Sequence, residues 1–145
     1  ERAFVGHAPA VMGAFGQPLH HAFAVGQAGE RIGAKLDLHP LKAVGQRDWC
    51  IVSAANPQSM VLTDVENSTR LAQLETVIQQ GGWPCWRGVN LARGGTWLPE
   101  ETRCVLGISA IDGLRLAEEF GQFAVVGPDV EGVPMLVWTR LVASA

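Results

Sequence analysis

Signatures of the common catalytic and cofactor-binding folds are missing from this sequence. It has no G-x-S-x-G nucleophile elbow, no P-loop, no Rossmann glycine fingerprint and no H-E-x-x-H zinc motif. Gly94-Gly95 is an isolated pair in a predicted loop and gives no phosphate-binding signal. The familiar sequence grounds for assigning hydrolase, nucleotide-binding or zinc-peptidase activity are therefore absent, and the sequence leaves open whether the protein is an enzyme.

Cysteine is scarce, with only Cys50, Cys85 and Cys104 at long and unequal spacings. No C-x-x-C pair or cysteine–histidine ladder is present, so the sequence predicts no metal site and no cofactor. Cys50 and Cys104 each begin an apolar run, which is typical of buried thiols in a cytosolic protein, and a disulfide is the less favoured alternative. The four histidines all lie within residues 1–46, where a structural or surface role is favoured over catalysis.

Lysine occurs only twice, and the net charge is -3. The basic residues are scattered, whereas a protein that binds duplex nucleic acid usually carries a clustered basic face. No apolar run approaches the ~20 residues of a membrane-spanning helix. Polar residues and prolines also interrupt the first two dozen residues, which argues against a signal peptide. We therefore expect a cytoplasmic protein without a nucleic-acid or membrane partner; the oligomeric state is not indicated.

The sequence contains enough apolar residues, 48% in all, for one packed domain over residues 1–145. Residues 1–46 have a weak pattern, broken by glycines, that suggests short strands and turns and a short helix at 41–44. The later residues alternate clearly between two patterns. Apolar runs predict strands at 49–55, 84–89, 104–108, 123–126 and 135–138, with a loop at 90–100.

Two helices are predicted from their capping residues and apolar spacing. Thr63 and Glu66 have capping-box spacing before a helix over residues 64–80, and Gly81-Gly82 ends it. Ser109 is the predicted N-cap of a second helix over residues 110–120, with an apolar face of Ile111, Leu114, Ala117 and Phe120. The alternation of strands and helices predicts an α/β (or α+β) fold, in which a mixed sheet of about five or six strands is covered by these helices.

A set of short segments occurs in a fixed order from Trp49 onward: Trp49, residues 53–59 (S-A-A-N-P-Q-S), Glu66-Asn67, Arg70, Leu74, Gly88-Val89, Trp97, residues 99–101 (P-E-E), residues 105–108 (V-L-G-I), residues 120–122 (F-G-Q) and Ala124. This pattern resembles DUF3293, a bacterial family of unknown function. Members typically have tyrosine-containing strands near the start, and this chain has no tyrosine. The resemblance implies a fold and a bacterial, cytoplasmic setting, but no activity.

The main candidate site is a polar group made of Asn56, Ser59, Asn67 and Arg70. Asn56-Pro57 should end a buried strand, and loops at the carboxyl ends of strands commonly bind ligands. Asn67 and Arg70 share one face near the start of the predicted helix, where backbone N–H groups and a guanidinium suit an anion. The favoured alternative is structural: Asn67 and Arg70 would pin the loop at residues 56–59 against the helix.

Three further residues complete the candidate set. Glu100 or Glu101 would be the only acid/base candidate, although both are more readily explained as solvated loop charges. Gln122, at a helix exit, would either bind a ligand or satisfy backbone groups at the turn.

Two functions follow from these residues. The first is binding of a small anionic or nucleotide-like ligand at the Asn56/Arg70 junction. The alternative is a protein-interaction or regulatory module that uses a surface bearing Trp83, Trp86 and Trp97 and has no catalytic activity.

Overall fold

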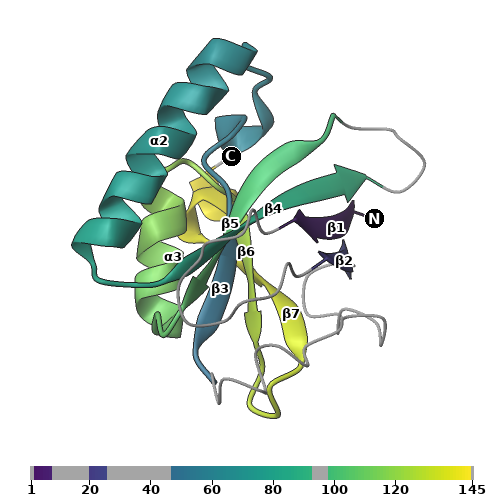
Figure 1. Cartoon of the computed structure of the whole chain (residues 1–145), viewed down its shortest axis with the longest axis vertical. Coiled ribbons are helices and arrows are strands. Elements are labelled where there is room, and N and C mark those ends of the chain that lie inside the picture. Colours follow the sequence, from purple (N-terminus) through teal and green to yellow (C-terminus); the bar gives the residue numbers. More distant parts are fainter. Residues whose placement is uncertain (1, 8–19, 26–46, 93–97, 145) are drawn as a thin grey trace.

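The computed structural model describes residues 2–7, 20–25, 47–92 and 98–144. Over these ranges the chain forms one seven-stranded sheet with the strand order β2-β1-β4-β5-β3-β6-β7. Helices α2 and α3 lie on the same side of the sheet (Figure 1). The strands are β1 (Arg2–His7), β2 (His20–Val25), β3 (Trp49–Val52), β4 (Cys85–Ala92), β5 (Glu100–Leu106), β6 (Ala124–Pro128) and β7 (Pro134–Trp138); the helices are α2 (Asp64–Gln80) and α3 (Ala110–Glu119), with 3-10 turns η1 (Pro57–Ser59) and η3 (Arg140–Ser144).

Both helices begin where their capping residues predict. The Thr63 hydroxyl accepts from the backbone N–H of Glu66, and the Glu66 carboxylate accepts from the backbone N–H of Thr63. Ser109 caps α3 by accepting from the backbone N–H of Asp112. The apolar face predicted for α3 is wrong at Ile111, which is 60% exposed in the first turn, whereas the close approach of α3 to β3 is made at Gly113, beside Cys50.

Alternation along the strands gives the sheet two apolar faces. Facing the helices, Cys50 and Val52 of β3 and Val105 of β5 join Leu74 and Ile78 of α2 in the larger core. On the other face, alternate residues of β3, β5 and β6 form a second core of Trp49, Ile51, Leu106 and Val126. A strand buried on both faces explains why residues 49–52 are continuously apolar.

The fold class, the single domain and the two helices are confirmed, but the prediction of a mixed sheet is wrong for the described strands. Every pair of neighbouring strands is antiparallel. Helix α2 connects β3 to β4, which run in the same direction, but β5 lies between them. Helix α3 connects β5 to β6 in the same way, with β3 between them. The helical crossovers therefore join parallel strands that are not neighbours, which is why an alternating sequence does not give parallel pairs.

The predicted loop at residues 90–100 is partly wrong. Strand β4 continues to Ala92 and β5 starts at Glu100, because the two strands form a hairpin in which Asn90 lies opposite Glu100. Strands β1 and β2 agree with the short strands expected in the first part of the chain. The short helix predicted at residues 41–44 lies outside the described residues.

The C-terminal turn η3 is tied to α3 by one ion pair, which makes a first prediction. Glu118 accepts from the backbone N–H and from Nε and Nη2 of Arg140, with an Nη2–Oε2 distance of 2.6 Å. These hydrogen bonds lower the pKa of Glu118 from 4.5 to about 2. Because the folded pKa lies below the unfolded value, the pair stabilises the fold above about pH 4.5, and its contribution is lost as the pH falls toward 2.

The carboxyl carbon of Glu118, followed by NMR, should therefore titrate near pH 2, and Arg140→Ala should raise its pKa toward the ordinary range, because only the backbone N–H of residue 140 still donates to it. Arg115→Ala removes a different ion pair of the same helix, with Asp112, and should leave Glu118 unchanged. A normal Glu118 pKa in the parent protein would contradict the pairing.

Candidate functional site

The segment that follows β3 has an unusual backbone. Asn56, Gln58 and Ser59 all have positive φ angles, of 46°, 51° and 62°. Left-handed backbone costs a residue other than glycine about 1–2 kcal/mol, although asparagine tolerates it better than most. Such conformations persist only where the surrounding structure fixes them, and they cluster at functional sites.

The Asn56 side chain is the main group that fixes this segment. Its Oδ1 accepts from the backbone N–H of Leu62 and from Asn67 Nδ2, both at 3.0 Å. Its Nδ2 donates to Glu100 Oε1 at 2.7 Å, and its backbone N–H donates to Asn67 Oδ1 at 2.9 Å. The amides of Asn56 and Asn67 thus bind each other from the loop and from α2, and Glu100 joins them from β5.

Arg70 and Gln122 connect the same segment to the end of α3. Arg70 donates from Nε to the Ala54 carbonyl at 2.7 Å and from Nη2 to the Phe120 carbonyl at 2.5 Å. Gln122 Nε2 donates to the Ala55 carbonyl at 3.0 Å. Among the described residues, Arg70 forms no ion pair with a carboxylate. Within the described ranges, its charge is balanced by carbonyl dipoles.

The structure brings five of the predicted residues together, namely Asn56, Asn67, Arg70, Glu100 and Gln122. Ser59 lies in the same loop but is exposed, and its hydroxyl donates to no described residue. The interpretation of Glu100 as a solvated charge is wrong, because its side chain is 6% exposed and binds Asn56. Glu101 is exposed as expected, but its carboxylate faces Arg103 on the helix side of the sheet. A role of these residues in ligand binding stays a prediction.

The capping box of α2 occupies part of the backbone N–H groups that the sequence interpretation assumed to be open. The Glu66 N–H binds the Thr63 hydroxyl and the Asn67 N–H binds the Thr63 carbonyl, at 3.3 and 2.9 Å. The Thr63 hydrogen bonds also lower the pKa of Glu66, so this residue keeps its negative charge at the helix start. Any anion at this junction would therefore depend on Arg70, which lies further along the helix.

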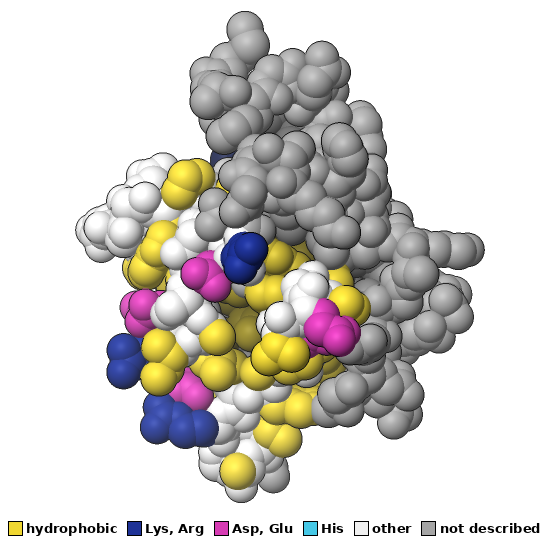
Figure 2. All heavy atoms as spheres, turned by 90° about the horizontal axis from the view of Figure 1, so that it is seen from below, with side chains coloured by type: hydrophobic (Ala, Val, Ile, Leu, Met, Phe, Trp, Pro, Cys, Tyr) yellow, Lys and Arg dark blue, Asp and Glu magenta, His cyan; other side chains and the backbone are white. Residues whose placement is uncertain are grey.

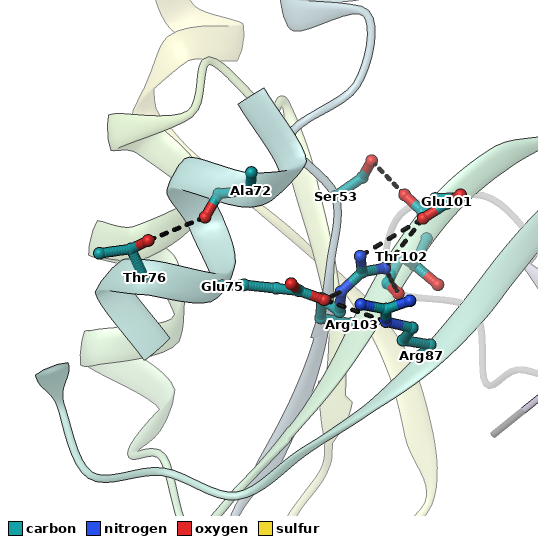
Figure 3. A network of polar contacts seen from close by, with 8 residues as sticks. All are labelled: Ser53, Ala72, Glu75, Thr76, Arg87, Glu101, Thr102 and Arg103. Carbon is teal, nitrogen blue, oxygen red and sulfur yellow. Dashed lines mark hydrogen bonds and ion pairs between the residues drawn. The ribbon is translucent and has the colours of Figure 1, made fainter. Parts of the chain in front are cut away.

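A second polar network under α2 was not predicted. Arg103 is buried, and its Nε donates to Glu75 Oε1 at 2.9 Å while its Nη1 donates to the Thr102 carbonyl at 2.8 Å (Figure 3). Arg87, directly opposite Arg103 in the hairpin, binds the same Glu75 oxygen at 3.1 Å. One carboxylate from α2 thus bridges two arginines that would repel each other. The signal for this network in the sequence was the position of Glu75, which directly follows Leu74 of the predicted apolar helix face.

The cysteines are not suited to nucleophilic chemistry at neutral pH. Burial raises the pKa of Cys50 to about 12, and it also raises the pKa of Cys85 and of Cys104. They are thiols without a disulfide, as favoured from the sequence. Within the described ranges no three histidine, cysteine or acidic side chains gather as a metal site, and no helix is long and apolar enough to cross a membrane.

The surface expected to carry tryptophans is only partly described. Trp83 packs against the larger core and Trp86 against the smaller one, while Trp97 lies outside the described residues. Trp138, which the interaction hypothesis did not include, is 46% exposed. Figure 2 shows one face on which hydrophobic side chains gather near the middle and charged side chains lie around them. Trp83 and Trp86 are thus partly buried, and each packs against one of the two cores.

Comparison with known proteins gives one match. A family model described as "Protein of unknown function (DUF3293)" matches residues 52–125, which is about half of the chain. The matched segment contains the end of β3, the strained loop, α2, the β4–β5 hairpin and α3. No curated protein and no solved structure matches the chain.

The packing of the loop against the end of α3 can be tested with two glycines of similar conformation. Gly121 (φ 70°) and Gly82 (φ 73°) are both left-handed, so alanine should cost about 1–2 kcal/mol at either position. Only at Gly121 would the new Cβ meet another atom, since it would lie 2.8 Å from Pro57 Cβ.

Urea denaturation should therefore show a larger loss of unfolding free energy for Gly121→Ala than for Gly82→Ala, by roughly 1 kcal/mol or more. Equal losses would contradict the close contact between Pro57 and the end of α3.

Proposed function

The chain belongs to the DUF3293 family, whose description assigns no activity, and from the site geometry we propose that it binds a small anionic or nucleotide-like ligand at the Asn56/Arg70 junction. The observation that carries the proposal is the left-handed backbone of Asn56, Gln58 and Ser59 at the carboxyl end of a central strand. Purely structural turns are usually built with glycine at such positions. Gln58 and Ser59 occupy two of these positions, so their side chains offer groups that glycine could not supply.

The proposal divides the predicted residues into two groups. Asn56, Asn67, Glu100 and Gln122 hold the loop, because their side-chain amides and carboxylate are occupied by hydrogen bonds within it. Gln58 and Ser59 are exposed and their side chains bind no described residue, so they are the groups that would meet a ligand. The loop therefore supplies neutral donors on a rigid base.

Arg70 would supply the charge. Its Nε and one Nη2 donor are used on carbonyls, while Nη1 donates to no described residue and the side chain is partly exposed. A guanidinium that has no carboxylate partner among the described residues favours a ligand that carries a carboxylate or phosphate.

The interaction module is the weaker candidate. Two of the tryptophans on which it depended, Trp83 and Trp86, are partly buried against the cores, so only part of each ring is open to a partner. Nothing in the site assigns an acid/base, because Glu100 is engaged by Asn56 and Glu101 by Arg103. The proposal is therefore one of binding and includes no reaction.

The strain on which the proposal depends can be measured first. Gln58→Gly should leave the protein equally stable or up to about 1 kcal/mol more stable, because glycine removes the left-handed penalty but has greater freedom in the unfolded chain. Gln79→Gly makes the same change at an exposed right-handed position in α2 and should cost about 1 kcal/mol. If Gln58→Gly costs as much as this control, the loop is not strained.

Binding is tested by thermal shift against inorganic phosphate, nucleoside monophosphates and small dicarboxylates. A ligand at about one hundred times its Kd should stabilise the parent protein by about 2.7 kcal/mol. The double variant Gln58→Gly, Ser59→Gly should keep its melting temperature without ligand and lose most of the ligand-dependent shift, whereas Gln79→Gly should retain the shift. Absence of a shift across the panel, or an undiminished shift in the double variant, contradicts the proposal.

A further inference from the structure

Strand β7 (Pro134–Trp138) forms one edge of the described sheet. It ends the strand order, and among the described strands it pairs only with β6. An edge strand presents a row of unpaired backbone groups, so natural sheets usually place charged side chains or prolines there. β7 contains no charged side chain, and its one proline is Pro134 at the start. The rest of the strand therefore has the composition of a strand that another strand covers.

The ladder between β6 and β7 shows which backbone groups of β7 face outward. The Thr139 N–H donates to the Phe123 carbonyl at 2.8 Å, in register with the pairing of the two strands. In an antiparallel ladder, pairs that exchange hydrogen bonds alternate with pairs that do not. Every second residue counted back from Thr139 therefore faces β6. The residues whose backbone groups face away from β6 are Pro134, Leu136 and Trp138.

This outward row is complementary to itself. Antiparallel pairing of two copies about a two-fold axis at Leu136 makes each Leu136 exchange N–H···O=C bonds with the Leu136 of the other copy. The same register lets each Trp138 N–H donate to the Pro134 carbonyl of the other copy. Both outward N–H donors of each strand are then used. Pro134, which has no N–H, falls at the end of the ladder, where proline is tolerated.

Exposed apolar side chains follow the same symmetry. Trp138 is 46% exposed and would lie across from Pro134 of the other copy, so its ring would cover that residue. Val130, in the turn before β7, is fully exposed, and Val142 of η3 is 42% exposed. These two valines lie at opposite ends of β7. Antiparallel pairing therefore brings the turn of one copy toward η3 of the other.

We propose that β7 is the interface between two copies of this chain, which pair antiparallel about Leu136 and continue the sheet from one copy into the other. A second copy is the partner that fits because one register satisfies both strands at once and no charge in β7 opposes it. The proposal does not depend on ligand binding at the Asn56/Arg70 junction. That loop follows β3, and β6 lies between β3 and β7.

The first test is the oligomeric state of the full chain, measured by sedimentation velocity over a series of concentrations. The parent protein should show a monomer–dimer equilibrium. Trp138→Lys keeps the backbone N–H but replaces the ring with a charge against the apolar edge of the other copy. It should raise the Kd of the dimer about tenfold or more, because the two-fold axis repeats the change.

The matched control is Leu98→Lys. Leu98 is a 65% exposed apolar residue just before β5, and two strands, β3 and β6, lie between β5 and β7. This variant introduces the same charge away from the proposed interface. It should dimerise with the Kd of the parent protein.

The second test needs no variant and reads the strand edge directly. Amide hydrogen exchange, followed by NMR at low and high protein concentration, should show slower exchange of the Leu136 and Trp138 N–H groups in the dimer. The N–H groups of Val137 and Thr139 face β6, so dimer formation should change their exchange far less.

Three results would overturn the proposal. The first is a parent protein that stays monomeric at every concentration. The second is a folded Trp138→Lys that dimerises as tightly as the parent protein. The third is a dimer in which exchange of the Leu136 N–H does not slow with concentration, which would place the interface elsewhere. If Trp138→Lys does not fold, hydrogen exchange of the parent protein decides.

Discussion

The amide of Asn56 is the interaction on which this region of the fold depends. A side-chain amide has two donors and one oxygen with two lone pairs. Asn56 Oδ1 accepts from the Leu62 N–H and from Asn67 Nδ2, and Asn56 Nδ2 donates to Glu100. One small side chain therefore links the loop, helix α2 and strand β5. No apolar residue of similar size could do this, because burying the same backbone and carboxylate groups without partners would cost several kcal/mol.

The consequence is a loop that is rigid but locally unfavourable. Arg70 and Gln122 hold the carbonyls of Ala54, Ala55 and Phe120, and the Gln58 N–H donates to the Gly121 carbonyl at 2.7 Å. With so many bonds made from fixed helices, the backbone of Gln58 and Ser59 can be held in a conformation that it would not adopt alone. The two sets of residues thus have different roles. The hydrogen bonds from the helices fix the shape of the loop, and the exposed side chains of Gln58 and Ser59 form its surface.

Much of this region was predictable, and the rest depended on contacts remote in sequence. Thr63, Glu66 and Ser109 predict the helix starts because caps act within four residues. Asn56-Pro57 predicts the loop that follows the strand, but β3 ends earlier than predicted, at Val52 rather than Ala55. The grouping of Asn56 with Asn67 and Arg70 follows from placing a strand end beside the next helix. Burial of Glu100 was not predictable, since its partner is 44 residues away in the chain. The bridging of Arg87 and Arg103 by Glu75 depends on the hairpin register, which the weak pattern of residues 90–100 did not reveal.

Adjacent glutamates illustrate why sequence neighbours in this hairpin need to be considered separately. Glu100 and Glu101 follow each other at the start of β5, where successive side chains point to opposite faces. Glu101 turns to the helix side and meets Arg103 at 3.3 Å, while Glu100 turns to the other side and is buried beside Asn90 and Thr102. The helix side therefore gathers two arginines that two carboxylates balance, whereas among the described residues the other side gathers oxygen atoms around one carboxylate. A single strand thus places a charge-balanced network of arginines and carboxylates on one face of the sheet and a buried polar group on the other.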